Sequence, residues 1–309
     1  MPMIRMPLFS LNLLSLAMAV LMGIFSSCDR FDGEQEIPAY IRVDSIGFSS
    51  NYDKEGTDKQ AIIDVWVYVN DQLIGGFEVP AEIPVLQQGI SKIEIRPGVK
   101  LNGISSTRAP YPYLDPVIIP ELNLVPDSAV NIYPETEYRS NTVFVWMEDF
   151  EDPALSIVSG NGSDTGMFIT TPANAPGAFL DEYSEFSGEV VLEEDNTYML
   201  LQSDDGNGEG FVLTKGYYIF LELHFKTDIP VVVGLYIKQQ DNSILKTPYI
   251  ILNTTDEWKK IYVNFTPKVS DAAGAQNFKV YFEASRSDMD PSNAHIMFDN
   301  IKLLSRQNL

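Results

Sequence analysis

The sequence predicts an all-β protein in which two sandwich domains follow a targeting segment. Short runs of alternating apolar and polar residues recur from residue 38 to the end of the chain, whereas no long run shows a helical period. The 309 residues are 45% hydrophobic and 21% charged, which is the composition of a globular protein. At about 150 residues per domain, a chain of this length favours two domains.

The charge balance excludes one class of partner. The chain has 43 Asp and Glu residues against 21 Lys and Arg, which gives a formal net charge of -22. Such a protein repels the phosphate backbone of nucleic acids instead of releasing its counterions, so no nucleic acid partner is expected. One cysteine and two histidines also exclude a cysteine zinc site and a disulfide framework.

Residues 1–27 have the features of a signal peptide. Arg5 precedes a long apolar run from Pro7 to Phe25, and two serines follow. The next residue, Cys28, is the only cysteine, and its placement resembles the lipobox of bacterial lipoproteins, with Phe25 where leucine is usual. The resemblance implies cleavage before Cys28 and a covalent lipid on that residue. The alternative is an uncleaved signal anchor, since about 19 apolar residues can span a bilayer.

Residues 28–37 form a polar and mostly acidic stretch, which we expect to be an extended, solvated tether. An acidic stretch after the lipidated cysteine resembles the surface-export signal of lipoproteins from the Bacteroidota. This resemblance implies an outer-membrane lipoprotein that is exposed at the cell surface. In enterobacterial lipoproteins, by contrast, an Asp beside the cysteine implies retention at the inner membrane, and Asp29 occupies that position.

Residues 38–139 carry strand signals at short spacing. In the clearest run, 62–69, valines alternate with aromatic residues, and Asn70-Asp71 then offers a tight hairpin turn. The segment 110–134 contains six prolines, which exclude helices there and limit strands to sheet edges. The pattern resembles a small immunoglobulin-like β-sandwich.

Residues 140–309 form the second predicted domain. The segment 135–140 has no apolar periodicity, which places the domain boundary near residue 140. Beyond it, alternating runs predict strands at 143–150, 198–202, 217–225, 231–238, 260–265, 278–284 and 296–304.

Two short motifs bracket this second domain. Asp149-Phe150-Glu151 stands near its start, and the run 298–303, Phe-Asp-Asn-Ile-Lys-Leu, stands near its end. With the run 256–263 between them, they resemble carbohydrate-binding-module-like jelly rolls of the galactose-binding type. The resemblance implies a jelly-roll β-sandwich and a structural calcium ion (Ca²⁺) held by Glu151 and Asp299.

A physical argument also singles out Asp299. It lies two residues before Ile301 and four before Leu303. Side chains alternate between the two faces of a strand, so an unbroken strand would point the Asp299 carboxylate toward the core with them. A buried carboxylate costs several kcal/mol unless it is paired or bound to a metal, and Ca²⁺ prefers oxygen ligands. The alternative is that a β-bulge turns Asp299 to solvent or that Asp299 caps a turn.

The sequence offers no evident residue set for catalysis. Because Cys28 is assigned to the lipid, a nucleophilic triad could draw only on His224 and His295, and hydrolase motifs such as G-x-S-x-G are missing. His224 alternates with leucines and Phe225, which predicts that it lies on a solvated strand face. We therefore expect a protein without enzymatic activity.

Three tyrosines are candidates for ligand binding. Tyr236, Tyr262 and Tyr281 each alternate with the aliphatic residues of their strands, so each side chain points to the face opposite those residues. They are therefore expected on outer sheet faces, where aromatic rings can pack against the C–H faces of sugars. The alternative is that each ring is ordinary strand filler with its hydroxyl in water.

Two functions are compatible with a lipid-anchored pair of sandwiches. The first expectation is an accessory subunit of an outer-membrane protein complex for nutrient uptake, secretion or protein insertion, by analogy with surface lipoproteins of this kind. The alternative is glycan binding by the jelly-roll domain. A groove that displays a tyrosine beside polar residues would favour a glycan, whereas an exposed apolar patch would favour a protein partner.

Overall fold

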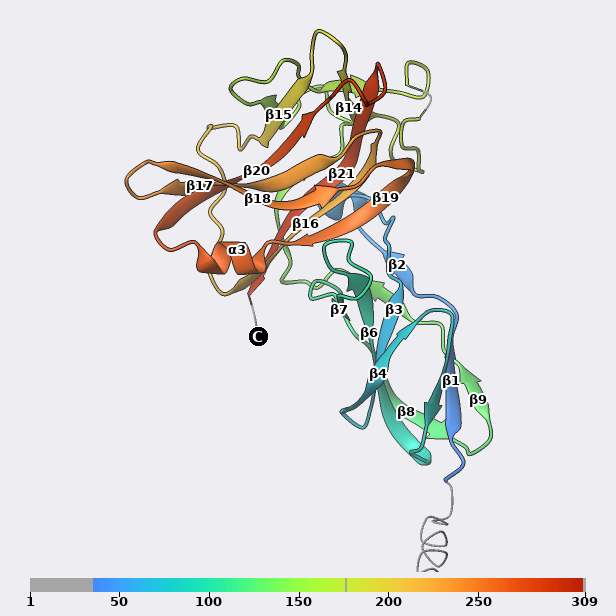
Figure 1. Ribbon diagram of the computed structural model, residues 1–309. Helices are drawn as coiled ribbons and strands as arrows, with labels where there is room; N and C mark the ends of the chain where they lie inside the picture. Colours follow the sequence, from blue (N-terminus) through green and yellow to red (C-terminus); the bar gives the residue numbers. More distant parts are fainter. Residues whose placement is uncertain (1–35, 176, 308–309) are drawn as a thin grey trace, which may run out of the picture.

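A computed structural model describes residues 36–175 and 177–307 and confirms the predicted all-β class. Two β-sandwich domains are stacked end to end, with the N-terminal domain below the C-terminal domain in Figure 1. The predicted signal peptide, Cys28 and nearly all of the tether lie outside the described residues, so they stay predictions. Within the described ranges, no helix is long and apolar enough to cross a membrane.

The N-terminal domain contains one five-stranded sheet and one three-stranded sheet. The larger has the order β4-β3-β6-β7, with β8 also paired to β6, and the smaller has the order β5-β1-β9. Strands β2 and β10 form a separate parallel pair. The elements are β1 (Ala39–Val43), β2 (Gly47–Ser49), α2 (Tyr52–Glu55), β3 (Asp64–Val69), β4 (Gln72–Glu78), β5 (Ala81–Val85), β6 (Gly89–Lys100), β7 (Arg108–Pro110), β8 (Val117–Leu124), β9 (Ala129–Asn131) and β10 (Glu135–Glu137).

Apolar residues at every second position of the strands form the core of this domain. Val65, Val67 and Val69 on β3 are fully buried and belong to one apolar cluster with side chains of the smaller sheet. Asn70 and Asp71 have φ values of 51° and 66°, a left-handed conformation that these two residue types tolerate. The predicted hairpin turn between β3 and β4 is therefore confirmed. The immunoglobulin-like assignment of this sandwich stays a prediction.

The C-terminal domain is a jelly-roll β-sandwich. Its first sheet has the order β13-β14-β21-β16-β19, with β11 also paired to β21, and its second sheet has the order β12-β15-β20-β17-β18. Apolar side chains from the inner faces of both sheets form one large core. The elements are β11 (Val143–Glu148), β12 (Ile157–Ser159), β13 (Phe168–Thr170), β14 (Ser187–Leu192), β15 (Tyr198–Ser203), β16 (Tyr217–Thr227), β17 (Val231–Gln239), β18 (Ile244–Leu252), β19 (Thr255–Asn264), α3 (Thr266–Asp271), β20 (Ala275–Ser285) and β21 (Ala294–Gln307).

A third apolar cluster joins the two domains. It contains Tyr111, Tyr113 and Tyr138 from the N-terminal domain, and Phe220, Tyr262 and Leu304 from the C-terminal domain. The hydroxyl of Tyr113 lies 2.7 Å and 2.9 Å from the backbone oxygens of Tyr218 and Leu304, respectively. The domains therefore meet in a packed interface, which covers part of the outer face of the first sheet.

A further part of that outer face is covered by the chain segment before β14. Phe179 from this segment packs on His224, with ring centroids 4.6 Å apart, and His224 is only 5% exposed. The predicted solvated face for His224 is therefore wrong, because alternation identifies a sheet face but not what covers it. Burial lowers the pKa of His224 well below its ordinary value, so its ring is neutral at pH 7.

Candidate functional site

The outer face of the second sheet in the C-terminal domain holds a cavity of about 340 Å³, here called the sheet groove. Strands β15, β17, β18 and β20 supply most of its lining, and two loops supply the rest. The lining residues are Asn161, Leu200, Gln202, Gly208, Glu209, Tyr236, Lys238, Ile244, Asn277, Phe278 and Lys279. A concave surface with two aromatic residues, aliphatic side chains and several amides is suited to a small polar ligand that also has apolar faces.

Tyr236 is the one predicted tyrosine that lines this groove. Its side chain is half-buried, and its ring packs on Tyr281 at a centroid distance of 4.9 Å and an interplanar angle of 42°. Tyr281 is fully buried, so it is not available as an exposed binding ring. It supports Tyr236 from behind and fixes the orientation of the ring that a ligand would meet.

A glycine and an ion pair hold Tyr281 in place. An added Cβ at Gly234 would lie only 2.6 Å from Cε1 of Tyr281, so the tyrosine ring occupies the space that the glycine leaves. On its other side, Lys246 Nζ lies 5.0 Å from the centroid of the Tyr281 ring and 2.7 Å from Glu283 Oε1. Burial raises the pKa of Tyr281 to about 12, so its hydroxyl stays neutral at pH 7.

The polar groups of the sheet groove are three side-chain amides, the Tyr236 hydroxyl, one ion pair and Lys279. Lys238 pairs with Glu209 at the rim, so these two charges offset each other. Asn277 Nδ2 donates to the backbone oxygen of Glu209 at 3.2 Å, which orients the Asn277 amide. Gln202 and Asn161 add two more amides that can donate to and accept from sugar hydroxyls.

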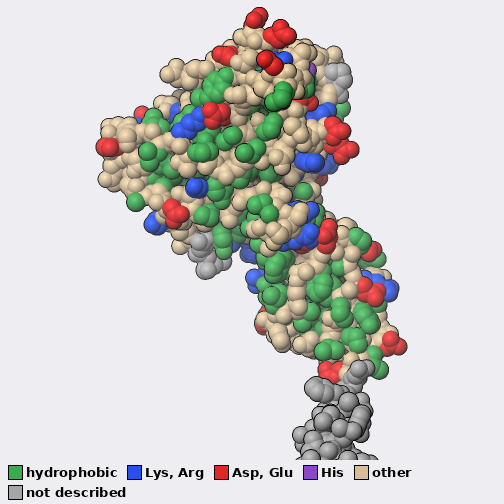
Figure 2. All heavy atoms as spheres, in the orientation of Figure 1, with side chains coloured by type: hydrophobic (Ala, Val, Ile, Leu, Met, Phe, Trp, Pro, Cys, Tyr) green, Lys and Arg blue, Asp and Glu red, His purple; other side chains and the backbone are tan. Residues whose placement is uncertain are grey.

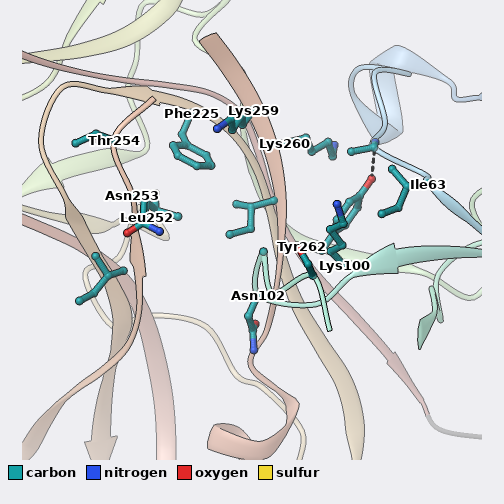
Figure 3. Close-up of a pocket in the computed structure, with 15 residues that line it drawn as sticks. Ile63, Lys100, Asn102, Phe225, Leu252, Asn253, Thr254, Lys259, Lys260 and Tyr262 are labelled. Carbon is teal, nitrogen blue, oxygen red and sulfur yellow. Dashed lines mark hydrogen bonds between the residues drawn. The ribbon is translucent and has the colours of Figure 1, made fainter. Parts of the chain in front are cut away.

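Tyr262 lies on the opposite sheet, inside the interface between the domains. It is 2% exposed, and its hydroxyl accepts a hydrogen bond from the backbone nitrogen of Ala61 at 2.9 Å, shown as the dashed line in Figure 3. It lines a junction cavity of about 550 Å³ together with Lys100 and Lys259. Parity placed Tyr262 on an outer sheet face, but the N-terminal domain covers that face, so the structure does not bring Tyr262 together with Tyr236.

Asp299 is buried, but for a different reason than the strand pattern predicts. The pairing between β16 and β21 shifts between Glu222 and His224, and Asn300 has a φ of 48°, so β21 has a bulge at this point. The bulge moves Asp299 to the outer face, opposite His224. Its carboxylate does not reach solvent there, because the segment before β14 covers it and leaves it 0% exposed.

Asp299 and Glu151 bind the same short segment, residues 184–187, with Asp299 at both of its ends and Glu151 at its middle. Oδ2 of Asp299 accepts hydrogen bonds from the hydroxyls of Ser187 (2.8 Å) and Ser184 (3.2 Å). Oε1 of Glu151 accepts from the backbone nitrogens of Glu185 (2.8 Å) and Phe186 (3.0 Å). Burial raises the pKa of Asp299 well above its ordinary value, and the charge of Glu151 raises it further.

The oxygens around Asp299 are of the type that Ca²⁺ takes as ligands. The carboxylates of Asp299 and Glu151 approach residues 184–187, which contribute the hydroxyls of Ser184 and Ser187, and a cation bound by these oxygens would hold Asp299 ionised despite its burial. Among residues 36–175 and 177–307, no group of three or more His, Cys, Asp and Glu side chains is placed to hold a metal ion. A site here would therefore depend on hydroxyl and backbone oxygens for the rest of its ligands.

Comparisons with known proteins show likeness of shape only. No protein-family model matches the sequence, and no curated protein matches it. Tailspike protein 4 of Bacteriophage CBA120, in its enzymatically active domain, is 12% identical with a TM-score of 0.33, over 53% of this chain and 19% of that one. A xylanase 10B fragment of Clostridium thermocellum with CBM22 and GH10 modules is 11% identical with a TM-score of 0.36, over 54% of this chain and 29% of that one.

Single binding modules match over nearly their whole length. A xylan-binding domain from CBM22 is 10% identical with a TM-score of 0.34, over 54% of this chain and 97% of that one. A CBM61 module in complex with β-1,4-galactotriose is 11% identical with a TM-score of 0.31, over 50% of this chain and 92% of that one. Each of these likenesses covers about half of the present chain.

Proposed function

We propose that this protein binds a glycan in the sheet groove. The observation that carries the proposal is the half-buried ring of Tyr236, which lines the groove and is held by Tyr281. Sugar rings present C–H faces that pack on an aromatic ring and hydroxyls that need donors and acceptors, and Tyr236 lies among amides that supply both. Because Tyr281 already holds the Tyr236 ring in position, ligand binding does not have to order that side chain, which would otherwise weaken the affinity.

The amides of the groove are suited to an uncharged sugar. Glu209 pairs with Lys238 at the rim, and Lys279 is the one further charged residue that lines the described groove. The amides of Asn161, Gln202 and Asn277 form hydrogen bonds without requiring a charged partner. The proposed ligand is therefore a neutral oligosaccharide.

A glycan array tests this proposal. The purified full chain should bind a restricted set of neutral oligosaccharides, and the Tyr236→Ala variant should lose those signals. Tyr133→Ala is the matched control, because Tyr133 is a tyrosine that is 75% exposed on the other domain. Equal signals from the wild type and Tyr236→Ala, or no signal from any glycan, would refute glycan binding in this groove.

Binding without catalysis is part of the proposal. The polar lining of the sheet groove consists of amides, one tyrosine, an ion pair and Lys279, and no histidine or cysteine lines it in the described structure. Glu209 is the one carboxylate of that lining, whereas hydrolysis of a glycosidic bond ordinarily uses a pair of carboxylates. We therefore expect an oligosaccharide bound in the groove to be released unchanged.

A lipid anchor on Cys28 and contact with an outer-membrane partner form the second proposal. Exposed aliphatic side chains gather at the end of the N-terminal domain from which the tether leaves. Ile37 and Leu86 are 56% and 55% exposed and flank the paired residues of β1 and β5, and Ile90 is 65% exposed. Apolar side chains exposed in this way are typical of surfaces that contact a membrane or a membrane protein.

Affinity capture from membranes tests this second proposal. The full chain with Ile37, Leu86 and Ile90 replaced by Ser should lose an outer-membrane partner that the wild type retains. Met289→Ser is the control, since Met289 is 95% exposed on the other domain. Mass spectrometry should also show an acylated N-terminal Cys28, and an unmodified thiol with the leader still attached would refute the anchor.

We also propose a structural Ca²⁺ at Asp299 and Glu151. The support is chemical: a fully buried carboxylate beside a second carboxylate needs a positive charge to stay ionised. When bound, the ion would supply that charge and fix residues 184–187 against β21. The role is structural, because the sheet groove lies on the other sheet of the sandwich.

A further inference from the structure

The interface between the domains holds a second cavity, here called the arginine cavity. It has a volume of about 430 Å³ and is lined by both domains, with Arg96 and Arg139 from one and Arg306 from the other. Figure 2 shows Lys and Arg side chains gathered where the two domains meet. In a chain with a net charge of -22, the described lining of this cavity contains three arginines and no Asp or Glu.

Arg306 is buried in this cavity, and two of its three guanidinium nitrogens lack acceptors among the described residues. The residue is 6% exposed, and neither Nε nor Nη1 has a hydrogen-bond partner among the described residues. The guanidinium carbon lies 5.4 Å from the centroid of the Tyr218 ring. A cation–π contact attracts the charge but leaves the N–H groups unsatisfied, which costs free energy in a buried site.

The neighbouring charges do not neutralise Arg306. Arg96 is already paired, with Nε 2.6 Å from Glu94 Oε1. Arg139 reaches Asp115 at 3.4 Å, but its own Nε also lacks a partner among the described residues. Burial and the positive charge of nearby Arg139 lower the pKa of Arg306. One carboxylate thus faces two arginines, and the cavity keeps a surplus positive charge.

We propose that the arginine cavity binds an oxyanion, the carboxylate or sulfate group of a small ligand, through Arg306 and Arg139. The planar guanidinium fork forms two parallel hydrogen bonds to either group, and a buried fork gains most from them. Tyr111, Pro112 and Tyr218 provide apolar walls for the rest of the ligand. The volume suits a molecule of about the size of one sugar residue.

This site is separate from the sheet groove and does not depend on glycan binding there. The two cavities share no lining residue. The sheet groove offers amides to a neutral ligand, whereas the arginine cavity offers positive charge to an anionic one. A variant in one cavity should therefore leave binding in the other unchanged.

Calorimetric titration of the full chain tests the proposal. The probes are sodium sulfate and sodium glucuronate, with glucose as the neutral probe and ionic strength held constant with sodium chloride. We expect the cavity of the wild type to bind at least one of the two anions saturably and not to bind glucose. The Arg306→Gln variant should bind that anion about tenfold more weakly or not at all. Arg42→Gln should bind as the wild type does, because Arg42 is an exposed arginine paired with Glu82 in the N-terminal domain.

The pattern of results identifies the group that is recognised. Saturation by sulfate alone assigns a sulfate group, and saturation by glucuronate alone assigns a carboxylate. Glucose displacing glucuronate, equal anion binding by the wild type and Arg306→Gln, or no saturable anion binding would each overturn the proposal. Arg306→Lys covers the case in which Arg306→Gln does not fold: it keeps the charge without the fork and should still bind the anion more weakly than the wild type.

Discussion

Lys260 Nζ lies 2.8 Å from Oε2 of Glu222, and the two side chains are 2% and 0% exposed at the interface between the domains. The hydroxyls of Tyr111 and Tyr138 also donate to Glu222, at 2.6 Å and 3.0 Å. Burial alone would raise the pKa of this carboxyl, but Lys260 and Lys302 hold the pKa below its ordinary value. An ionised, fully buried cluster with partners from both domains therefore fixes one domain against the other.

Removal of the charge on Glu222 should destabilise the protein strongly. Glu222→Gln leaves two buried lysines without their counter-charge, and we expect the free energy of unfolding to fall by about 3 kcal/mol. Glu82→Gln is the control: it removes a carboxylate from an exposed pair with Arg42 and should change stability by less than about 1 kcal/mol. Urea unfolding measures both, and similar losses for the two variants would contradict the account of the interface.

Lys302 should make stability rise with pH. Burial lowers the pKa of Lys302 to about 7 from its ordinary 10.5, so between these values the unfolded chain binds more protons than the folded one. The contribution of Lys302 to the free energy of unfolding should therefore increase between pH 7 and pH 9, by about 1 kcal/mol per pH unit. Below pH 7 both states are protonated and the slope should vanish.

Comparison with Lys302→Met isolates this effect. The variant loses the hydrogen bond from Nζ to the backbone oxygen of Thr57, so its overall stability can differ from that of the wild type, but its slope between pH 7 and pH 9 should be smaller. Urea unfolding at four or more pH values gives both slopes. Equal slopes would show that Lys302 keeps an ordinary pKa in the folded protein.

Calcium should stabilise the C-terminal domain through Asp299. A ligand that binds only the folded state raises stability by mass action, so addition of EDTA should lower the melting temperature of the wild type. Asp299→Asn should melt at the same temperature with and without EDTA, whereas Asp271→Asn, at an exposed position, should respond as the wild type does. A wild-type melt that EDTA leaves unchanged would refute the calcium site.

Strand alternation was enough to predict the class of the fold and the faces of most strands. It placed Tyr236 and Tyr281 on outer sheet faces but not on the same one, and the structure brings their rings together on β17 and β20. It could not tell which ring is covered, because that depends on cross-strand neighbours such as Gly234 and Lys246. Gln202 could have been found by the same parity argument, since it alternates with buried Leu201 and Ser203 on β15.

Long-range contacts are what the sequence could not predict. Tyr262 has the parity of an exposed ring, but residues about 200 positions earlier in the chain cover it. Asp299 follows the parity of the core, but a bulge at Asn300 reverses its direction. The arginine cavity joins Arg139 and Arg306, which no local pattern connects.

The affinity of the Tyr236→Ala variant tests the central claim most directly. Calorimetric titration with a neutral oligosaccharide that the wild type binds should give an affinity about tenfold weaker or no binding, because the variant loses the ring that packs on the sugar. Tyr133→Ala should keep the wild-type affinity, and all three proteins should melt at similar temperatures. A Tyr236→Ala variant that binds the oligosaccharide as tightly as the wild type would place the glycan elsewhere and contradict the account.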